Sequence, residues 1–413
     1  MANIKLAAEI FRFYHAVKWQ RILVSCCFFP LSFLLIPSKA VQAKTWADHT
    51  IRPYVSLGTS YDSNLLRSAG SVVGSKGSFI TQLGAGFDMD WTLSSQQLLI
   101  RAIVNENIFE NFSSLDYVGW DTLAQWNWQL GSHASGEIGY SNKHYLSSFG
   151  QVNQLIANLV DEEKYFANGG YFFHPNWQVR GGFNRNNWSY DSKDRQISNN
   201  SEDTGEIGLQ YLSPSRDMAG VRVSLISGSY PNRQAPDLKK DPNGLDNSYM
   251  RYKYELVWDW ATSVKTRFDG QVGYVEQRYD HNSNFNFTGI VSRANLKWLA
   301  TEKSNFLLSG WREFSQAANV NTSFILRQGI GLTPTWMPSP KIQLLIPASY
   351  EQQSYLGTVP ETDNIWLTGL NLLYKPSDNV ELGMLMQHEQ RHSTVSSRTY
   401  KSESVGLNLR VTF

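Results

Sequence analysis

Apolar and polar residues alternate without interruption along the last segment of the chain. The apolar residues occupy every second position and end on an aromatic side chain: Val405, Leu407, Leu409, Val411 and Phe413. Successive side chains of a β-strand point to opposite faces of a sheet, so this pattern predicts a strand with one apolar and one polar face. Such a strand is stable only where its apolar face is covered, either by a protein core or by lipid.

The same alternation recurs through much of the chain, with bulky aromatic residues on one face. Residues 249–260 carry Met, Tyr, Leu and Trp at the even positions, and residues 117–130 carry three Trp on one face. Charged residues make up only 18% of the chain and aromatic residues 13%, while the mean hydropathy is -0.36. After Ala43 no apolar run is long enough to cross a membrane as a helix. These features predict an all-β fold, a transmembrane antiparallel up-and-down β-barrel in the outer membrane of a Gram-negative bacterium.

Turn-forming residues divide the chain into about 18 strands. We predict strand starts near residues 51, 78, 97, 117, 133, 161, 176, 203, 218, 247, 263, 284, 304, 322, 340, 363, 378 and 400. Short connections alternate with long ones, and barrels have short periplasmic turns and longer outer loops. Both chain ends are therefore expected on the periplasmic side, which requires an even number of strands. Sixteen strands are the alternative, because residues 284–315 alternate poorly.

Aromatic residues and loop lengths add two expectations about the barrel ends. Trp residues adjoin the short turns and predict an aromatic girdle at the periplasmic interface; they are Trp91, Trp128, Trp177, Trp260, Trp298 and Trp336. The longest connections, 61–77 and 231–246, are candidates for a constriction or a gate.

Residues 1–43 have the features of a cleavable signal peptide. Basic residues precede an apolar run of 15 residues, Ile22 to Ile36, and Val41-Gln42-Ala43 offers small residues for cleavage. We therefore divide the chain into a signal peptide (1–43), a short periplasmic segment (44–50) and the barrel (51–413). Residues 1–43 hold both cysteines, five of the 37 Lys and Arg and one of the 36 Asp and Glu, which leaves a net charge of about -3. This near-balance argues against nucleic acid as a partner.

Two motifs that could carry chemistry are better explained by strands and turns. Residues 388–392 read His-Glu-Gln-Arg-His and match the zinc-protease pattern HExxH. On a strand the two His residues lie roughly 13 Å apart at about 3.3 Å per residue, too far to share a metal ion. His133 and Ser135 lie beside a periplasmic turn without a third group to orient a catalytic base. We predict no enzymatic activity, no metal site and no cofactor.

The polar faces of the strands carry the residues that would line the lumen. Predicted inward residues are Arg101, Arg180, Arg222, Arg251, Lys253, Arg267, Arg327, Lys341, Arg410, Asp121, Glu255, Asp259, Asp269 and Glu381. Either these charges pair to hydrate and brace a wide lumen, or they form a track for a sugar chain. In such a track, amides and charges bind hydroxyls or carboxylates, and aromatic faces stack on sugar rings. The candidates for polysaccharide contact are Arg180, Arg222, Arg251, Lys253, Arg327, Arg410, Glu255 and Glu381.

A series of short motifs in a fixed order resembles one known family. Arg-Pro-Tyr at 52–54 is followed by Tyr-Asp-Ser-Asn-Leu-Leu-Arg at 61–67 and Trp-Asn-Trp-Gln-Leu-Gly at 126–131. Ser-Gly-Ser-Tyr-Pro at 227–231, Trp-Arg-Glu at 311–313 and Leu-Tyr-Lys-Pro at 373–376 continue the series. In this order they resemble the EpsL-like outer-membrane proteins of exopolysaccharide-biosynthesis loci, often those with an exosortase. The resemblance implies passage of an exopolysaccharide across the outer membrane, with separate periplasmic and inner-membrane export partners. It carries over no catalytic residue.

Three functional hypotheses follow. The first is a non-catalytic export channel for an exopolysaccharide; the alternative is a general or sugar-selective diffusion porin. The third, an outer-membrane enzyme, lacks a cluster of acid, base or nucleophile at the outer rim. The terminal strand resembles the signal read by the barrel-assembly machinery, with Phe413, Val411 and Leu409 as its apolar positions.

Overall fold

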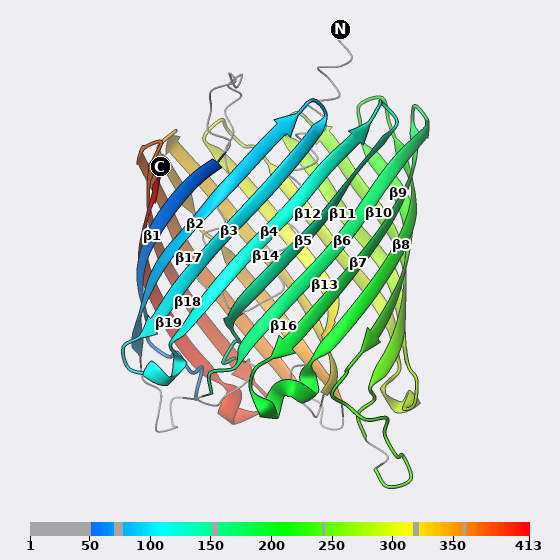
Figure 1. Ribbon diagram of the computed structural model, residues 1–413, viewed down its shortest axis with the longest axis vertical. Helices are drawn as coiled ribbons and strands as arrows, with labels where there is room; N and C mark the ends of the chain where they lie inside the picture. The colour runs from blue at the N-terminus through cyan, green and yellow to red at the C-terminus, as the bar shows by residue number, and fades with distance from the viewer. Residues whose placement is uncertain (1–50, 70–76, 151–155, 242–243, 317–321, 358–360) are drawn as a thin grey trace.

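A computed structural model describes residues 51–69, 77–150, 156–241, 244–316, 322–357 and 361–413 (Figure 1). The predicted signal peptide (1–43) and periplasmic segment (44–50) lie outside the described residues. Within these ranges the chain is almost entirely β-structure. The strands are β1 (Ile51–Asp62), β2 (Ser78–Leu93), β3 (Gln96–Phe109), β4 (Tyr117–Leu130), β5 (Ala134–Leu146), β6 (Leu159–His174), β7 (Trp177–Tyr190), β8 (Asn200–Leu212), β9 (Met218–Ser229), β10 (Ser248–Ser263), β11 (Thr266–Tyr279), β12 (Phe287–Trp298), β13 (Ser304–Gln316), β14 (Thr322–Ser339), β15 (Ile342–Leu345), β16 (Ala348–Gly357), β17 (Glu361–Ser377), β18 (Val380–Ser393) and β19 (Tyr400–Thr412).

Short helical turns in the described ranges lie in the connections between strands. They are η2 (Ser113–Leu115), η3 (Lys193–Ser198), η4 (Ser283–Phe285) and η5 (Ser396–Arg398). No helix among the described residues is long and apolar enough to cross a membrane.

The sheet closes into a barrel of 18 crossings. Each strand pairs antiparallel with its neighbours in sequence except β15 with β16, and β1 pairs with both β2 and β19. β15 and β16 both pair with β14 and β17, so they are two parts of one crossing interrupted at Ile346 and Pro347. The interruption follows from Pro347, which has no N–H for the ladder. The prediction of 18 strands is confirmed, and the alternative of 16 is wrong.

The ambiguous region, 284–315, contains an incomplete ladder. β12 and β13 pair only between Ser292–Trp298 and Phe306–Arg312. Beyond that point the rings of Phe287, Phe314 and Phe324 pack on one another, with centroids 3.8 to 5.4 Å apart. The side chain of Arg312 takes over one ladder bond by donating from Nε to the Ile290 carbonyl at 3.2 Å. In this region, packing between aromatic side chains takes the place of the missing ladder bonds, and the sequence does not alternate regularly between apolar and polar residues.

Both ends of the described barrel lie at the same edge. The Phe413 amide donates to the Pro53 carbonyl at 2.8 Å, next to the pairing of Tyr54 with Thr412. The short turns lie at this edge, and the longer connections with their helical turns lie at the other (Figure 1). By the loop-length rule for outer-membrane barrels, this is the periplasmic edge.

The two faces of the wall differ as the alternation predicts. Large apolar side chains are exposed on the outer face, for example Ile207 at 61% and Leu407 at 55%. The Trp girdle is found at the periplasmic ends, with Trp91, Trp177, Trp260, Trp298 and Trp336 all exposed. The sixth, Trp128, lies flat over Gly136 and Gly169 on the same face. An apolar outer wall bordered by Trp is the surface that lipid requires.

Candidate functional site: the polar lumen and its extracellular mouth

The lumen is lined by the residues that alternate with the exposed apolar ones. The structure places the eight candidates for polysaccharide contact on this inward face: Arg180, Arg222, Arg251, Lys253, Arg327, Arg410, Glu255 and Glu381. Arg101, Arg267, Asp121, Asp259 and Asp269 share that face. Whether any of them contacts a polysaccharide stays a prediction. Lys341 was placed wrongly: it lies in a periplasmic turn after β14, where Nζ donates to the Pro376 carbonyl at 2.9 Å.

Most of these charges are held in ion pairs between neighbouring strands. Glu255 on β10 accepts from Arg222 Nε at 2.9 Å, and its other oxygen lies 3.2 Å from Lys253 Nζ. Arg222 also donates to Gln271 Oε1 on β11 at 2.8 Å. Arg251 lies 3.2 Å from Glu202 on β8. These pairs link β8 to β11 across the lumen face.

The pattern continues on the following strands. Arg293 on β12 and Glu313 on β13 form two bonds of 2.7 Å, and Arg327 on β14 reaches Glu351 on β16 at 2.9 and 3.1 Å. The paired groups cancel each other's charge at close range. A wall built this way stays hydrated and rigid but presents little net field to a passing solute.

Two further candidates lie on the lumen face near the periplasmic end of the barrel. Arg410 on β19 bonds Asp88 on β2 at 2.6 Å and lies over the ring of Tyr54, 3.5 Å from its centroid. Glu381 on β18 lies 2.5 Å from Lys375 on β17. Arg410 therefore occupies the inward position expected for it, where it contacts side chains of β1 and β2.

A network rich in amide side chains crosses the lumen face from β2 to β7, beside the ion pairs of Arg101 with Asp88 and of Lys143 with Asp121. One chain of hydrogen bonds links six strands: Gln97 donates to Asp90, Asn127 to Gln97, Gln125 to Asn127 and Glu137, Asn168 to Glu137, and Arg180 to Asn168. The donor–acceptor distances run from 2.7 to 3.2 Å. Amides both donate and accept, so this part of the wall suits solutes with hydroxyl groups.

At the extracellular end, two connections fold into the barrel. Leu65 in the β1–β2 connection and Phe149 in the β5–β6 connection are buried together with Phe109 and Leu115. Ile80 on β2 packs against this cluster. Phe109 and Ile80 belong to the inward faces of their strands, so the cluster lies inside the mouth rather than above it. These apolar contacts narrow the opening beside β2, β3 and β4.

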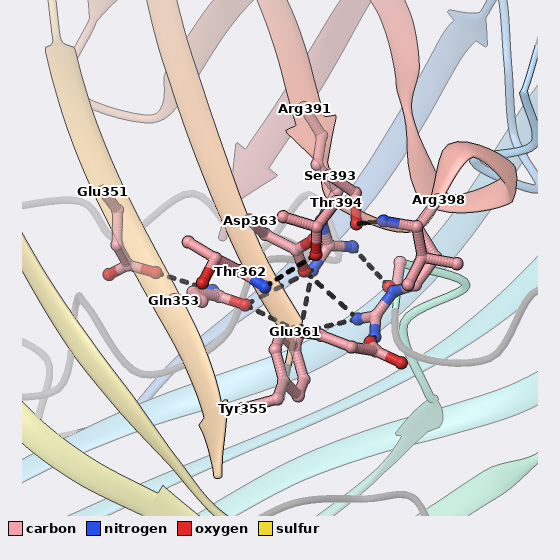
Figure 2. Close-up of polar contacts among 12 residues, drawn as sticks. Glu351, Gln353, Tyr355, Glu361, Thr362, Asp363, Arg391, Ser393, Thr394 and Arg398 are labelled. Carbon is pink, nitrogen blue, oxygen red and sulfur yellow. Dashed lines mark hydrogen bonds and ion pairs between the residues drawn. The ribbon is translucent and has the colours of Figure 1, made fainter. Parts of the chain in front are cut away.

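A buried charged cluster on β16, β17, β18 and η5 (Figure 2) binds the β5–β6 connection, which starts six strands away around the wall. Arg391 on β18 lies 2.7 Å from Asp363 on β17 and 2.9 Å from the hydroxyl of Tyr355 on β16, and its Nη1 donates to the Gly150 carbonyl. Arg398 in η5 reaches the same carboxylate at 3.3 Å. β5 and β18 are six strand spacings apart, roughly 29 Å along the wall at about 4.8 Å per strand. The bond to Gly150 therefore fastens a loop that crosses the mouth.

The β1–β2 connection has its own anchor. Arg67 adopts a left-handed backbone conformation with φ 53° and is almost fully buried. Its Nη1 donates to Asp62 at 2.9 Å and to Ser402 at 3.0 Å, and its Nε lies 3.3 Å from Glu389. Burial alone would lower the pKa of Arg67, but the Glu389 and Asp62 carboxylates outweigh burial and hold the pKa above its usual value. The connection is thus fixed to β18 and β19 by a permanent charge.

The two loops singled out by length behave differently from each other. Residues 63–69 of the 61–77 connection lie inside the mouth, whereas residues 70–76 lie outside the described residues. Residues 231–241 of the 231–246 connection are mostly exposed and project away from the barrel (Figure 1). The second inserted loop is instead the β5–β6 connection. Length alone did not reveal it, although Leu146 and Phe149 give it an apolar stretch that lumen-facing Phe109 can bury.

The motifs considered for chemistry are parts of the wall. His388 pairs with Glu403 at 2.5 Å, while Glu389 between the two His residues points inward to Tyr400 and Arg67. His133 lies in a turn beside Ser132. Among the described residues, no group of three or more His, Cys, Asp or Glu is placed to hold a metal ion.

One family model and several solved structures match the chain. The sequence model of the family described as "putative beta-barrel porin 2" matches residues 261–413, somewhat more than a third of the chain. A search of curated protein sequences finds no significant match. Among solved structures, the chain is similar to OpdK from Pseudomonas aeruginosa at 10% identity, covering 88% of this chain and 99% of that one with a TM-score of 0.47. It is also similar to OccK2 (OpdF) from the same organism in complex with glucuronate, at 8% identity, 88% and 98% coverage and a TM-score of 0.49. OccAB3 from Acinetobacter baumannii gives 8% identity, 88% and 99% coverage and a TM-score of 0.47.

The resemblance to EpsL-like proteins is not confirmed by these comparisons. The expectation of an outer-membrane barrel is confirmed. The chain is a closed 18-stranded antiparallel β-barrel of the outer membrane.

Proposed function

We propose that the protein is a passive diffusion porin for small hydrophilic solutes, with a mouth narrowed by its β1–β2 and β5–β6 connections. The observation that carries the proposal is the buried Arg391 cluster, which fixes a loop across the mouth of a wide polar barrel. An 18-stranded barrel encloses an aqueous channel, and an inserted loop sets the size of solute that can pass.

The charge pattern supports a pore without strong preference for either sign of ion. Lumen arginines such as Arg222, Arg293 and Arg327 each face a carboxylate on a neighbouring strand. Neutral solutes therefore lose little on entering, and the amide face of β2 to β7 replaces part of their hydration. This favours sugars and similar compounds over strongly charged solutes.

Export of an exopolysaccharide remains the alternative that the EpsL resemblance suggests. It would require separate periplasmic and inner-membrane partners, and a polymer chain would have to displace two loops anchored by buried ion pairs. The barrel-assembly machinery is the one partner that both functions need, because each depends on insertion of the barrel.

Liposome swelling tests the proposal. Vesicles containing the purified barrel should swell in isotonic monosaccharide and more slowly in larger saccharides, because the loops limit solute size. Vesicles with no protein, and vesicles with heat-unfolded protein, provide the controls. No swelling in any saccharide would reject the porin. A clean deletion that abolishes a secreted polysaccharide without changing solute uptake would favour the export channel.

A further inference from the structure

We propose that the lumen face of β6 and β7 holds a sugar-binding subsite whose platform is the ring of Phe166. The inference rests on the proposed function and names the solute class that this part of the wall recognises. None of the residues chosen as candidates from sequence, apart from Arg180, belongs to it.

The position of Phe166 is unusual for a lumen wall. Phe166 shares the inward face of β6 with Asn168, while the flanking Tyr165 is exposed on the outer face. Directly opposite Phe166 on β5 is Gly139, and a Cβ there would lie 2.4 Å from Phe166 Cζ. The ring therefore lies flat on the β5 backbone in the space that a side chain would fill. It is half-buried, which leaves part of its surface open to the lumen.

Hydrogen-bonding groups surround this ring on three sides. Asn184 on β7 is its register partner, and Asn168 is two residues farther along β6. Asn168 is oriented by Glu137 at 2.7 Å and by Arg180 at 3.2 Å. The Lys164 ammonium lies over the ring, 5.8 Å from its centroid. Donors and acceptors at the edge of an apolar face match the equatorial hydroxyls and the apolar C–H face of a pyranose.

A second aromatic side chain continues the path toward the extracellular end. Trp188 on β7 also faces inward, paired in register with Glu162 on β6. Glu162 is four residues from Phe166, roughly 13 Å at about 3.3 Å per residue. Lys164 and Asn186 occupy the intervening register pair. Aromatic and polar groups thus alternate along the wall at a spacing that a short oligosaccharide spans.

Among the described residues, the contacts of the inserted loops lie on other parts of the wall than the Phe166 ring. Their apolar cluster packs on β2, β3, β4 and the extracellular end of β5, and their polar anchors are on β18 and β19. The constriction therefore guides a solute toward the remaining wall, which includes β6 and β7.

The test is block of ion current by maltotriose in planar bilayers containing the full-length mature protein. Maltotriose should interrupt the current saturably, and Phe166→Ala should raise the half-blocking concentration about tenfold, equivalent to about 1.4 kcal/mol. Phe166→Tyr, which keeps the ring, should stay within about a factor of two of the parent. The matched control is Phe183→Ala, because Phe183 lies on the adjacent strand but is exposed on the outer face; it should leave the block unchanged.

The possible failures are distinguishable. If the folded parent carries no current, the proposed function and this inference both fall. If it conducts but maltotriose gives only the reduction expected from viscosity, the subsite is rejected and the porin stands. An unchanged block in Phe166→Ala, in a variant whose conductance equals that of the parent, also rejects the subsite.

Discussion

Replacing Arg391 by alanine should release the β5–β6 connection from the mouth of the barrel. The substitution removes the donor to the Gly150 carbonyl and the closest partner of Asp363, whose side chain is fully buried. A hydrogen bond from a charged donor contributes about 2 kcal/mol, which changes the ratio of latched to released loop roughly thirtyfold. We expect larger single-channel conductance with frequent transitions between levels, and faster proteolysis within the β5–β6 connection.

A second variant separates release of the loop from damage to the wall. Losing one partner of a buried ion pair costs about 3–5 kcal/mol, because the remaining charge is left without compensation. Arg398 still faces Asp363 at 3.3 Å and lessens this cost. Adding Asp363→Asn to Arg391→Ala removes the residual charge, so it should restore thermal stability while the loop stays released. Conductance and proteolysis equal to the parent in both variants would refute the role of Arg391 as a latch.

Three further predictions concern other parts of the barrel. Deleting Phe413 should lower the amount of assembled barrel in the outer membrane, whereas Arg410→Ala should spare assembly and alter transport. Equal surface levels of the deletion variant and the parent would contradict the prediction for Phe413. Glu255→Gln leaves Arg222 and Lys253 without their shared carboxylate. The reversal potential in a KCl gradient should therefore shift toward anion preference. The control is Glu403→Gln on the outer face, and equal reversal potentials of the two variants would contradict the prediction. Burial would raise the pKa of Asp246, but hydrogen bonds from the His281 side chain and the 281–282 backbone hold it below its usual value. The folded pKa of Asp246 lies below the unfolded value of about 3.9, so the stabilisation from Asp246 is present above about pH 4 and is lost as the pH falls. Amide hydrogen exchange of residues 281 and 282 should therefore accelerate in acid. An exchange rate that does not change, after correction for the intrinsic pH dependence of exchange, would refute this prediction.

Strand positions and facing were predictable from sequence because both are local. Alternation around Leu407 and turn residues such as Asn379 fix where a strand runs and which face is apolar, so Arg410 and Glu255 were placed correctly. Lys341 shows the limit of that method. It has the parity of an inward residue, but the turn after β14 extends one residue farther than its Pro-Ser-Pro sequence suggested.

The mouth could not be predicted in the same way. Arg391 and Gly150 are 241 residues apart, and they meet only because the barrel closes through β1 and β19. Alternation does mark Glu389 and Arg391 as inward residues, yet nothing local indicates which loop reaches them. Phe166 was overlooked for a similar reason, since its place depends on Gly139 being opposite it on another strand.

The most direct test of a diffusion porin is the current through the purified barrel in a planar bilayer. Insertion should give stepwise, ohmic increments in KCl, with a reversal potential in a salt gradient close to that of a weakly selective aqueous pore. Correctly folded protein that inserts into the bilayer without producing such increments would contradict the account.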